Sequence, residues 1–154
     1  MRLQNKVILI TGSYTGIGRA IARQCVKEGA KVVLNGLREE LGQDLMKEFD
    51  EDAVTRLTID ITDVEAPEKL IKKAITTFGK LDALVNNAAI VASSNMATTT
   101  KAYLERMLAV NTIAPFAIIQ AALPYLEQSK GNVVNIGSIN SWSGEANLLA
   151  YSIS

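Results

Sequence analysis

The stretch that decides the fold runs from Lys6 to Gly18 and has the sequence KVILITGSYTGIG. Its first part is an apolar run without polar alternation, which predicts a strand over 6–10 that is buried on both faces. The amphipathic pattern of 17–28 predicts a helix directly after the glycines. A glycine-rich turn between a strand and a helix leaves helix N–H groups free to bind phosphate. We therefore predict a phosphate-binding turn; the alternative is a glycine-rich loop without a ligand.

The three glycines of this turn have separate roles in such a site. Gly12 suits the tight turn out of the strand, Gly16 the close approach of the main chain to a pyrophosphate, and Gly18 the packing of the helix near the strand. No Gly-Lys-Ser or Gly-Lys-Thr follows, which excludes a P-loop. The turn is therefore typical of a dinucleotide-binding unit.

Short apolar runs alternate with longer amphipathic ones along the rest of the chain. This alternation is typical of right-handed β-α-β crossovers and predicts an α/β fold, a three-layer, doubly wound parallel sheet of the Rossmann kind. We expect one domain over 1–154. A further helix begins near Asn147 but the sequence stops at Ser154, so we expect the C-terminal part of the domain to be absent. The other predicted strands are 31–35, 54–59, 81–85 and 132–136, and the other helices are 39–49, 65–78 and 101–127.

The composition excludes several classes of function. Sixteen basic and sixteen acidic residues give a net charge of zero, which argues against nucleic acid or an anionic membrane as a partner. The absence of histidine excludes Ser-His-Asp and Cys-His nucleophiles and zinc sites built from histidine and cysteine, and we expect no metal. The single cysteine, Cys25, is interpreted as a core residue of a protein in a reducing compartment. The apolar run 7–10 is too short for a signal or membrane-spanning segment, so we expect a cytoplasmic protein.

The spacing of the glycine turn, Thr-Gly-x-x-x-Gly-x-Gly, resembles that of the short-chain dehydrogenase/reductase family. It differs from the spacing of the extended, epimerase-like branch. The resemblance implies a Rossmann fold, a nicotinamide dinucleotide cofactor and an oxidoreductase activity. It also implies that six residues of the turn bind the cofactor, namely Gly12, Ser13, Thr15, Gly16, Ile17 and Gly18.

Two further segments match the family at the ends of predicted strands. Asp60 and Ile61 follow the third strand, where the family places an acidic residue against the adenine ring. A helix-capping role is the alternative for Asp60. After the fourth strand, the sequence Asn-Asn-Ala-Ala is similar to the family's Asn-Asn-Ala-Gly, and the change to alanine asks only for a permissive backbone angle. The resemblance implies that three residues of this segment lie against the cofactor, namely Asn87, Ala88 and Ala89.

A proline inside a predicted helix draws attention to an asparagine. Pro115 lies within 101–127 and has no N–H to donate to the carbonyl of Asn111. The freed carbonyl needs another partner, and an ordered water is the natural one. The family has an asparagine here that holds a water in a proton relay, so the resemblance implies a catalytic role for Asn111. A simple kinked helix is the alternative.

Ser138 follows the fifth predicted strand, and Tyr151 comes thirteen residues later. They resemble the catalytic serine and the Tyr-x-x-x-Lys motif of the family. The resemblance implies that Ser138 hydrogen-bonds the substrate oxygen and that Tyr151 transfers a proton. The lysine of the motif would stand four residues after Tyr151, beyond the last residue. Because its ammonium group favours the phenolate, we expect the chain as given to bind cofactor weakly and to be inactive.

The choice of dinucleotide depends on the end of the second strand. No acidic residue stands there to repel a 2′-phosphate, and Arg38 could pair with one. Thr15 and Leu37 occupy the two positions at which the family usually carries its basic residues for NADP. We predict NADP as the cofactor, with NAD as the alternative.

The resemblance therefore implies an enzyme that transfers a hydride between NAD(P)(H) and a small carbonyl or alcohol substrate. A non-catalytic relative that senses dinucleotide or binds a partner protein is the main alternative, and a hydrolase built on carboxylates is another. The family assembles through the helix over 101–127 and the helix beginning near Asn147. We expect the full-length protein to be a homodimer or homotetramer.

Overall fold

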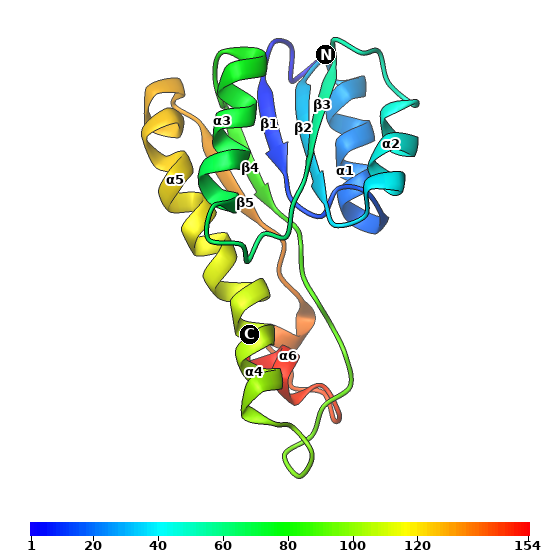
Figure 1. The fold of residues 1–154 in the computed structure, drawn as a ribbon, viewed down its shortest axis with the longest axis vertical. Helices are drawn as coiled ribbons and strands as arrows, with labels where there is room; N and C mark the ends of the chain where they lie inside the picture. Colours follow the sequence, from blue (N-terminus) through cyan, green and yellow to red (C-terminus); the bar gives the residue numbers. More distant parts are fainter.

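The computed structural model describes residues 1–154 and contains a parallel sheet with helices on both faces (Figure 1). Strands and helices alternate along the chain, as the sequence predicts. The strands are β1 (Val7–Ile10), β2 (Lys31–Gly36), β3 (Val54–Thr58), β4 (Ala83–Asn86) and β5 (Asn132–Asn135), and the main helices are α1 (Gly16–Lys27), α2 (Glu39–Met46), α3 (Ala66–Phe78), α4 (Lys101–Leu108), α5 (Ala114–Ser129) and α6 (Leu149–Ile153).

The strand order of the sheet is β3-β2-β1-β4-β5, and every neighbouring pair is parallel. β1 pairs with β2 on one side and with β4 on the other, so the strand order reverses at β1. In open sheets of this kind, ligands bind outside the carboxyl ends of the strands at such a reversal. The order confirms the doubly wound fold, and it places the glycine turn, which follows β1, at this position.

Two apolar clusters fill the space between the three layers. α1 and α2 cover one face of the sheet, and α3 and α5 cover the other (Figure 1). Val7 and Leu9 of β1 belong to the cluster beneath α3 and α5, whereas Ile8 and Ile10 belong to the cluster beneath α1 and α2. All four are buried, which confirms a strand covered on both faces. Cys25 is buried in the second cluster, as expected for a core residue.

The helix predicted over 101–127 is continuous but is not α-helical throughout. α4 passes into a π-helical turn at Ala109–Ile113, which α5 follows. The wider turn ends just before Pro115, and the N–H of Ala114 donates to the carbonyl five residues back. Proline therefore stands in the first turn of α5, where its missing N–H is tolerated. The helix therefore contains a π turn just before the proline, and Asn111 lies at the centre of this turn.

The helical segment Lys101–Ser129 is long and apolar enough to cross a membrane, judged by length and composition alone. In the structure, Ile118 and Ala122 of this segment are fully buried in the cluster that covers the sheet. A core helix passes the same test of length and hydropathy, so this property is weak evidence for a membrane span. Ile113 and Phe116 on its other side are exposed.

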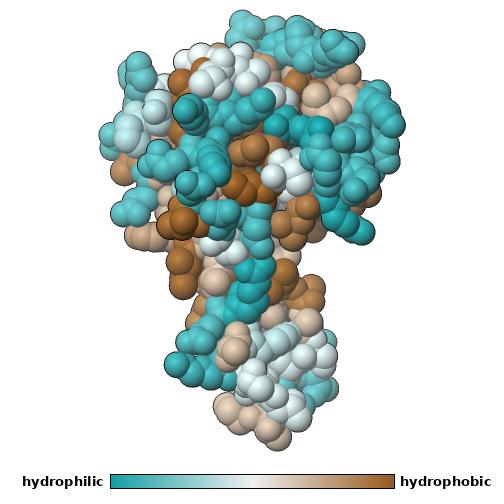
Figure 2. All heavy atoms as spheres, viewed as in Figure 1, coloured by the Kyte–Doolittle hydropathy of each residue, from teal (hydrophilic) through white to brown (hydrophobic).

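α4, α6 and the loops around them form a narrower part of the molecule, which extends from the sheet (Figure 1). In Figure 2 this part carries many residues of intermediate hydropathy, whereas the part that contains the sheet is mostly hydrophilic at its surface. Hydrogen bonds tie its loops together: the N–H of Ser94 donates to the Asn147 carbonyl at 2.7 Å, and the N–H of Leu149 donates to the Ser94 carbonyl at 3.1 Å. The Ser94 hydroxyl also accepts from the N–H of Ala150 at 2.9 Å. These bonds fix the start of α6 and thereby the position of Tyr151.

Candidate active site and cofactor cleft

Hydrogen bonds hold the glycine turn against the segment that follows β4. The hydroxyl of Thr11 accepts from the N–H groups of Asn87 and Ala88, each at 3.0 Å. In return, the Asn87 side-chain amide donates to the carbonyls of Thr11 and Gly12 at 2.9 and 3.1 Å. The turn after β1 and the segment after β4 therefore form one rigid unit.

Asn35, near the end of β2, holds the other side of the glycine turn in place through hydrogen bonds. Its main-chain N–H donates to the Ser13 hydroxyl at 2.9 Å, and its carbonyl accepts from the N–H of Ser13 at 2.7 Å. Its side-chain amide donates to the carbonyls of Leu57 and Ile59, both at 3.1 Å, and accepts from the N–H of Gly12 at 3.4 Å. This buried amide therefore has partners for its donors and its acceptor, as a stable buried polar group requires.

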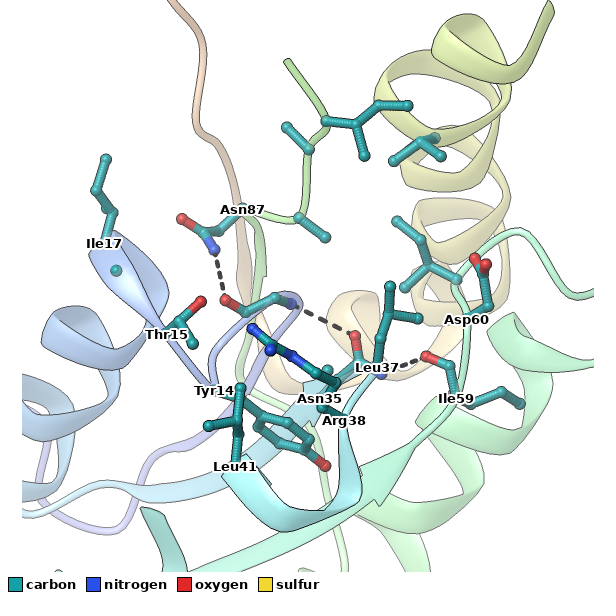
Figure 3. Close-up of a pocket in the computed structure, with 18 of the residues that line it drawn as sticks. Tyr14, Thr15, Ile17, Asn35, Leu37, Arg38, Leu41, Ile59, Asp60 and Asn87 are labelled. Carbon is teal, nitrogen blue, oxygen red and sulfur yellow. Dashed lines mark hydrogen bonds between the residues drawn. The ribbon is translucent and has the colours of Figure 1, made fainter. Parts of the chain in front are cut away.

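A cavity of about 400 Å³ lies outside the carboxyl ends of β1, β2 and β4 (Figure 3). This volume is within the roughly 300–1,000 Å³ usual for ligand sites. The structure places Ser13 and Gly18 behind the cavity wall, since Ser13 is fully buried and Gly18 packs against the Asn87 side chain. The other residues predicted to bind the cofactor all line the cavity: Gly12, Thr15, Gly16, Ile17, Arg38, Asp60, Ile61, Asn87, Ala88 and Ala89.

The glycine turn fits the pyrophosphate of a dinucleotide. Gly12 and Gly16 have φ angles of +60° and +54°, in the left-handed region that favours glycine. A methyl group added to Gly16 would meet no atom within 4 Å, so open space lies directly beyond it. α1 begins at Gly16, and its first turn has neither a capping side-chain bond nor an acidic residue. Its free N–H groups and helix dipole therefore attract an anion into this space.

The charges that line the cavity also suit a polyanion. Its lining contains two cations, Arg38 and Arg106, and a single carboxylate, that of Asp60. The Arg38 side chain forms no ion pair, which leaves its guanidinium free for a ligand. Figure 3 shows Asp60 at the opposite end of the cavity from Ile17, with Leu37 between them. Leu37 and Arg38 follow β2 directly, and neither Glu39 nor Glu40 of the next turn lines the cavity, so no carboxylate of the lining at this point repels a 2′-phosphate.

Asp60 is held by polar groups from two sides. Its Oδ1 accepts from the N–H of Thr62 at 2.9 Å and from the Thr62 hydroxyl at 2.8 Å, and its Oδ2 pairs with Arg106 at 2.9 Å. Burial alone would raise the pKa of Asp60, but the hydrogen bonds from Thr62 and Arg106 outweigh it and hold the pKa below its ordinary value. The carboxylate is therefore ionised at neutral pH. Its bonds to Thr62 belong to a local turn and are not the helix cap that was the alternative, because the N-cap of α3 is Glu65.

A second cavity, of about 310 Å³, brings Asn111, Ser138 and Tyr151 together. The three residues come from the π turn, from the segment after β5 and from α6. Ala88 and Ala89 line this cavity as well as the first. The proposed proton-transfer residues therefore adjoin the cleft that fits a dinucleotide.

Hydrogen bonds orient two of these three residues. The Ser138 hydroxyl accepts from the N–H of Asn140 and donates to its side-chain carbonyl, both at 3.2 Å. The side-chain carbonyl of Asn111 accepts from the N–H of Ile90 at 2.9 Å, and its amide donates to the Ile90 carbonyl at 3.0 Å and to the Ser154 hydroxyl at 2.9 Å. The Asn111 side chain therefore joins three segments, a role that the sequence argument about its main-chain carbonyl did not anticipate.

The structure adds site residues that the sequence did not single out. The ring of Tyr14 packs so closely on Gly36 and Gly42 that no larger residue fits at either, and its hydroxyl lies 2.9 Å from the Thr58 hydroxyl. A tyrosine within a glycine-rich turn was the only local signal of this contact. Three further polar residues orient predicted site residues, and no pattern marked them: Asn35, Arg106 and Asn140.

Comparison with known proteins decides the family. A family model described as short chain dehydrogenase matches residues 6–154. The chain belongs to the short-chain dehydrogenase family. An uncharacterized oxidoreductase of Staphylococcus aureus (strain MW2) is 38% identical to this short-chain dehydrogenase over 151 residues, which are 97% of this chain and 65% of the relative. One from Thermotoga maritima is 34% identical over 155 residues, which are 100% of this chain and 62% of the relative.

Solved structures share the architecture of this short-chain dehydrogenase. A short-chain dehydrogenase/reductase from Brucella melitensis, described as a glucose/ribitol dehydrogenase, has a TM-score of 0.95 at 26% identity and covers 99% of this chain and 65% of its own. A short-chain dehydrogenase from Streptomyces avermitilis has a TM-score of 0.89 at 31% identity and covers 96% of this chain and 54% of its own. The likeness confirms the Rossmann-type fold. The chain spans less than two thirds of the length of these curated relatives.

Proposed function

We propose that the chain is the dinucleotide-binding and proton-transfer part of an NADP-dependent oxidoreductase that interconverts a small carbonyl compound and its alcohol. The observation that carries the proposal is the junction of the two cavities at Ala88 and Ala89. It supports a reaction in which Tyr151 and Ser138 act on a substrate held beside the cofactor cleft. When bound, the dinucleotide supplies or accepts the hydride.

The dinucleotide would be held along the first cavity. Gly16 leaves room for the pyrophosphate at the start of α1, and the N–H groups there would provide its hydrogen bonds. Arg38 would pair with the 2′-phosphate of NADP, and Asp60 would accept a hydrogen bond from the adenine amine. The Asn-Asn-Ala-Ala segment would lie along the other wall, where its two alanines line both the first and the second cavity.

The substrate oxygen would lie in the second cavity, in contact with two hydroxyl groups. Tyr151 donates a proton to this oxygen during reduction and takes it back during oxidation. Ser138 already receives a hydrogen bond from the N–H of Asn140, so its own hydroxyl proton can turn from the Asn140 side chain to the substrate. Asn111 keeps the segment at Ile90 and the end of α6 in register, and its place in the π turn suits it to hold the water of a proton relay.

The test is the variant Tyr151→Phe in the full-length protein. We expect the variant to lose the oxidation of NADPH by a panel of small aldehydes and ketones. The Kd for NADPH, measured by titration of the nicotinamide fluorescence, should stay within about twofold of its value in the unmodified protein, because the phenol lies in the second cavity and not in the cofactor cleft. Turnover retained in the variant would exclude Tyr151 as the proton donor. Binding of NADPH without turnover of any carbonyl compound in the unmodified protein would favour the non-catalytic, dinucleotide-sensing alternative.

A further inference from the structure

Arg106 is the one residue of the cofactor cavity that α4 contributes. Its guanidinium spans two partners: Nη2 pairs with Asp60 Oδ2 at 2.9 Å, and Nη1 donates to the Thr62 hydroxyl at 2.7 Å. These partners are 46 and 44 residues away in the sequence. The contact therefore depends on the fold and is not a local helix pair.

The contacts of Asp60 are divided between its two oxygens. Thr62 supplies both hydrogen bonds to Oδ1, and Arg106 supplies the one to Oδ2. A carboxylate oxygen can accept more than one hydrogen bond, so each keeps capacity for a ligand. The terminal torsion of an aspartate is soft and has no sharp preferred angle. Without Arg106, nothing in the structure would hold Oδ2, and the direction of the carboxylate would be set by Thr62 alone.

The end of the cavity around Asp60 combines this oriented charge with apolar walls. Leu37, Ile61 and Val110 line the same cavity, and Figure 3 shows Asp60 next to this end, away from Ile17. A flat heterocycle that carries an amine fits such a place, because its faces contact the apolar side chains and its N–H donates to an ionised acceptor. Hydrogen bonds to an ionised acceptor are stronger than neutral ones and depend on direction.

We propose that Arg106 is a positioning residue that directs the Asp60 carboxylate toward the exocyclic amine of the adenine ring and thereby sets the preference for an adenine dinucleotide. The inference rests on the proposed function, since it takes a dinucleotide as the ligand. It goes further in assigning base recognition to a pair of residues, one of which does not touch the base.

A merely structural role of Arg106 would have a different consequence. If the arginine only attached α4 to the loop after β3, its loss would raise the Kd for every dinucleotide by the same factor. The hypoxanthine analogue of NADPH separates the two roles, because it replaces the amine by a carbonyl oxygen, with a proton on the neighbouring N1, and leaves the sugars, the phosphates and the nicotinamide unchanged. The ratio of the two Kd values therefore reports on the Asp60 contact and is insensitive to general loosening of the site.

The experiment compares Kd values for NADPH and its hypoxanthine analogue by calorimetric titration of the full-length protein. In the unmodified protein, we expect the adenine form to bind on the order of tenfold more tightly, as for a hydrogen bond to a charged group. Arg106→Met should lower this ratio to about two. Arg106→Lys keeps the charge but cannot bridge Asp60 and Thr62, so it should give an intermediate ratio. Arg23→Met is the matched control, since Arg23 pairs with Glu48 on the outside of the molecule, and it should leave the ratio unchanged.

We expect the variants to fold because the Arg106 side chain is half exposed, and a far-UV circular dichroism melt checks this. Should the methionine variant fail to fold, the lysine variant carries the test alone, with a fall in the ratio of about threefold expected. An unchanged ratio in the folded Arg106 variant would overturn the inference, and so would equal binding of both dinucleotides by the unmodified protein. In either case NADPH still binds and the proposed function stands; binding of neither dinucleotide would reject both.

Discussion

At Gly12 and Gly16 of the glycine turn, we expect the same substitution to alanine to have two different consequences. Both have a positive φ, so a side chain at either costs about 1–2 kcal/mol of backbone strain. At Gly12, the new methyl carbon would also lie 2.8 Å from the Ala88 Cα and 3.1 Å from the Asn87 side-chain nitrogen. These atoms belong to the rigid unit of turn and β4 segment, so overpacking adds about 1–3 kcal/mol. At Gly16, the methyl carbon would meet nothing within 4 Å.

The two variants should therefore separate stability from ligand binding. Gly12→Ala should lower the free energy of unfolding by about 2–5 kcal/mol and Gly16→Ala by about 1–2 kcal/mol. For a chain of this size, each kcal/mol shifts the Tm by about 2–4 °C. Gly16→Ala should nevertheless raise the Kd for NADPH on the order of tenfold or more, because its methyl group stands in the space assigned to the pyrophosphate.

Thermal melts and NADPH titrations of the two variants measure these effects. Gly79→Ala is the matched control, because Gly79 has a φ of +79° and open space around it but caps α3 away from the cavity. It should cost as much stability as Gly16→Ala and leave the Kd unchanged. Equal losses of stability in the Gly12 and Gly16 variants would refute the packing argument. Unchanged affinity in Gly16→Ala would refute the placement of the pyrophosphate.

Three further predictions concern the adenosine end of the cleft, the turn and a buried carboxylate. Arg38→Ser should raise the Kd for NADPH on the order of tenfold and leave the Kd for NADH unchanged, because only NADPH carries the 2′-phosphate; equal losses of affinity for both would contradict the choice of NADP. Tyr14→Phe removes the hydroxyl near Thr58 and keeps the ring, so urea denaturation should show a loss of about 1 kcal/mol, and a fully stable variant would show that this bond contributes nothing. Burial alone would raise the pKa of Asp82, but bonds from two lysines and a main-chain N–H lower it below its ordinary value. Its ionised form therefore stabilises the fold above about pH 4, and this contribution is lost as the pH falls through the lowered pKa. Melts between pH 7 and 2 should show a decline in stability that is shallower in Asp82→Asn; identical acid profiles would count against a stabilising role of these three contacts.

Much of the fold could be predicted from the sequence because its elements are marked by local patterns. The strand over 6–10, the glycine turn and the helix after it were each predicted from adjacent residues, and the structure has all three in place. The predicted ends of elements differ by a few residues, as for α2, which was expected over 39–49 and spans Glu39–Met46. The π turn differs more, because proline shows that a hydrogen bond is missing but not how the neighbouring turn adjusts.

The candidate site could be predicted residue by residue but not as an arrangement. Asn111, Ser138 and Tyr151 were each named from a motif, and their meeting in one cavity depends on the order of β4 and β5 in the sheet. The partners that orient them are not marked by any motif. Asn140 is a neighbour of Ser138 in the sequence, yet only the short 3-10 turn between them brings its side chain back to the hydroxyl.

The sequence by itself determined the Rossmann-type architecture, the family and the glycine turn between β1 and α1, since hydrophobic periodicity and glycine spacing are properties of contiguous residues. The tertiary structure alone decided how the polar groups pair. Asn35 fastens the turn from β2, and Arg106 reaches Asp60 across 46 residues, because the packing of helices on the sheet sets the distances between remote side chains. A polar residue carries the same donors and acceptors wherever it stands, so its partner is chosen only when the fold brings one within about 3 Å.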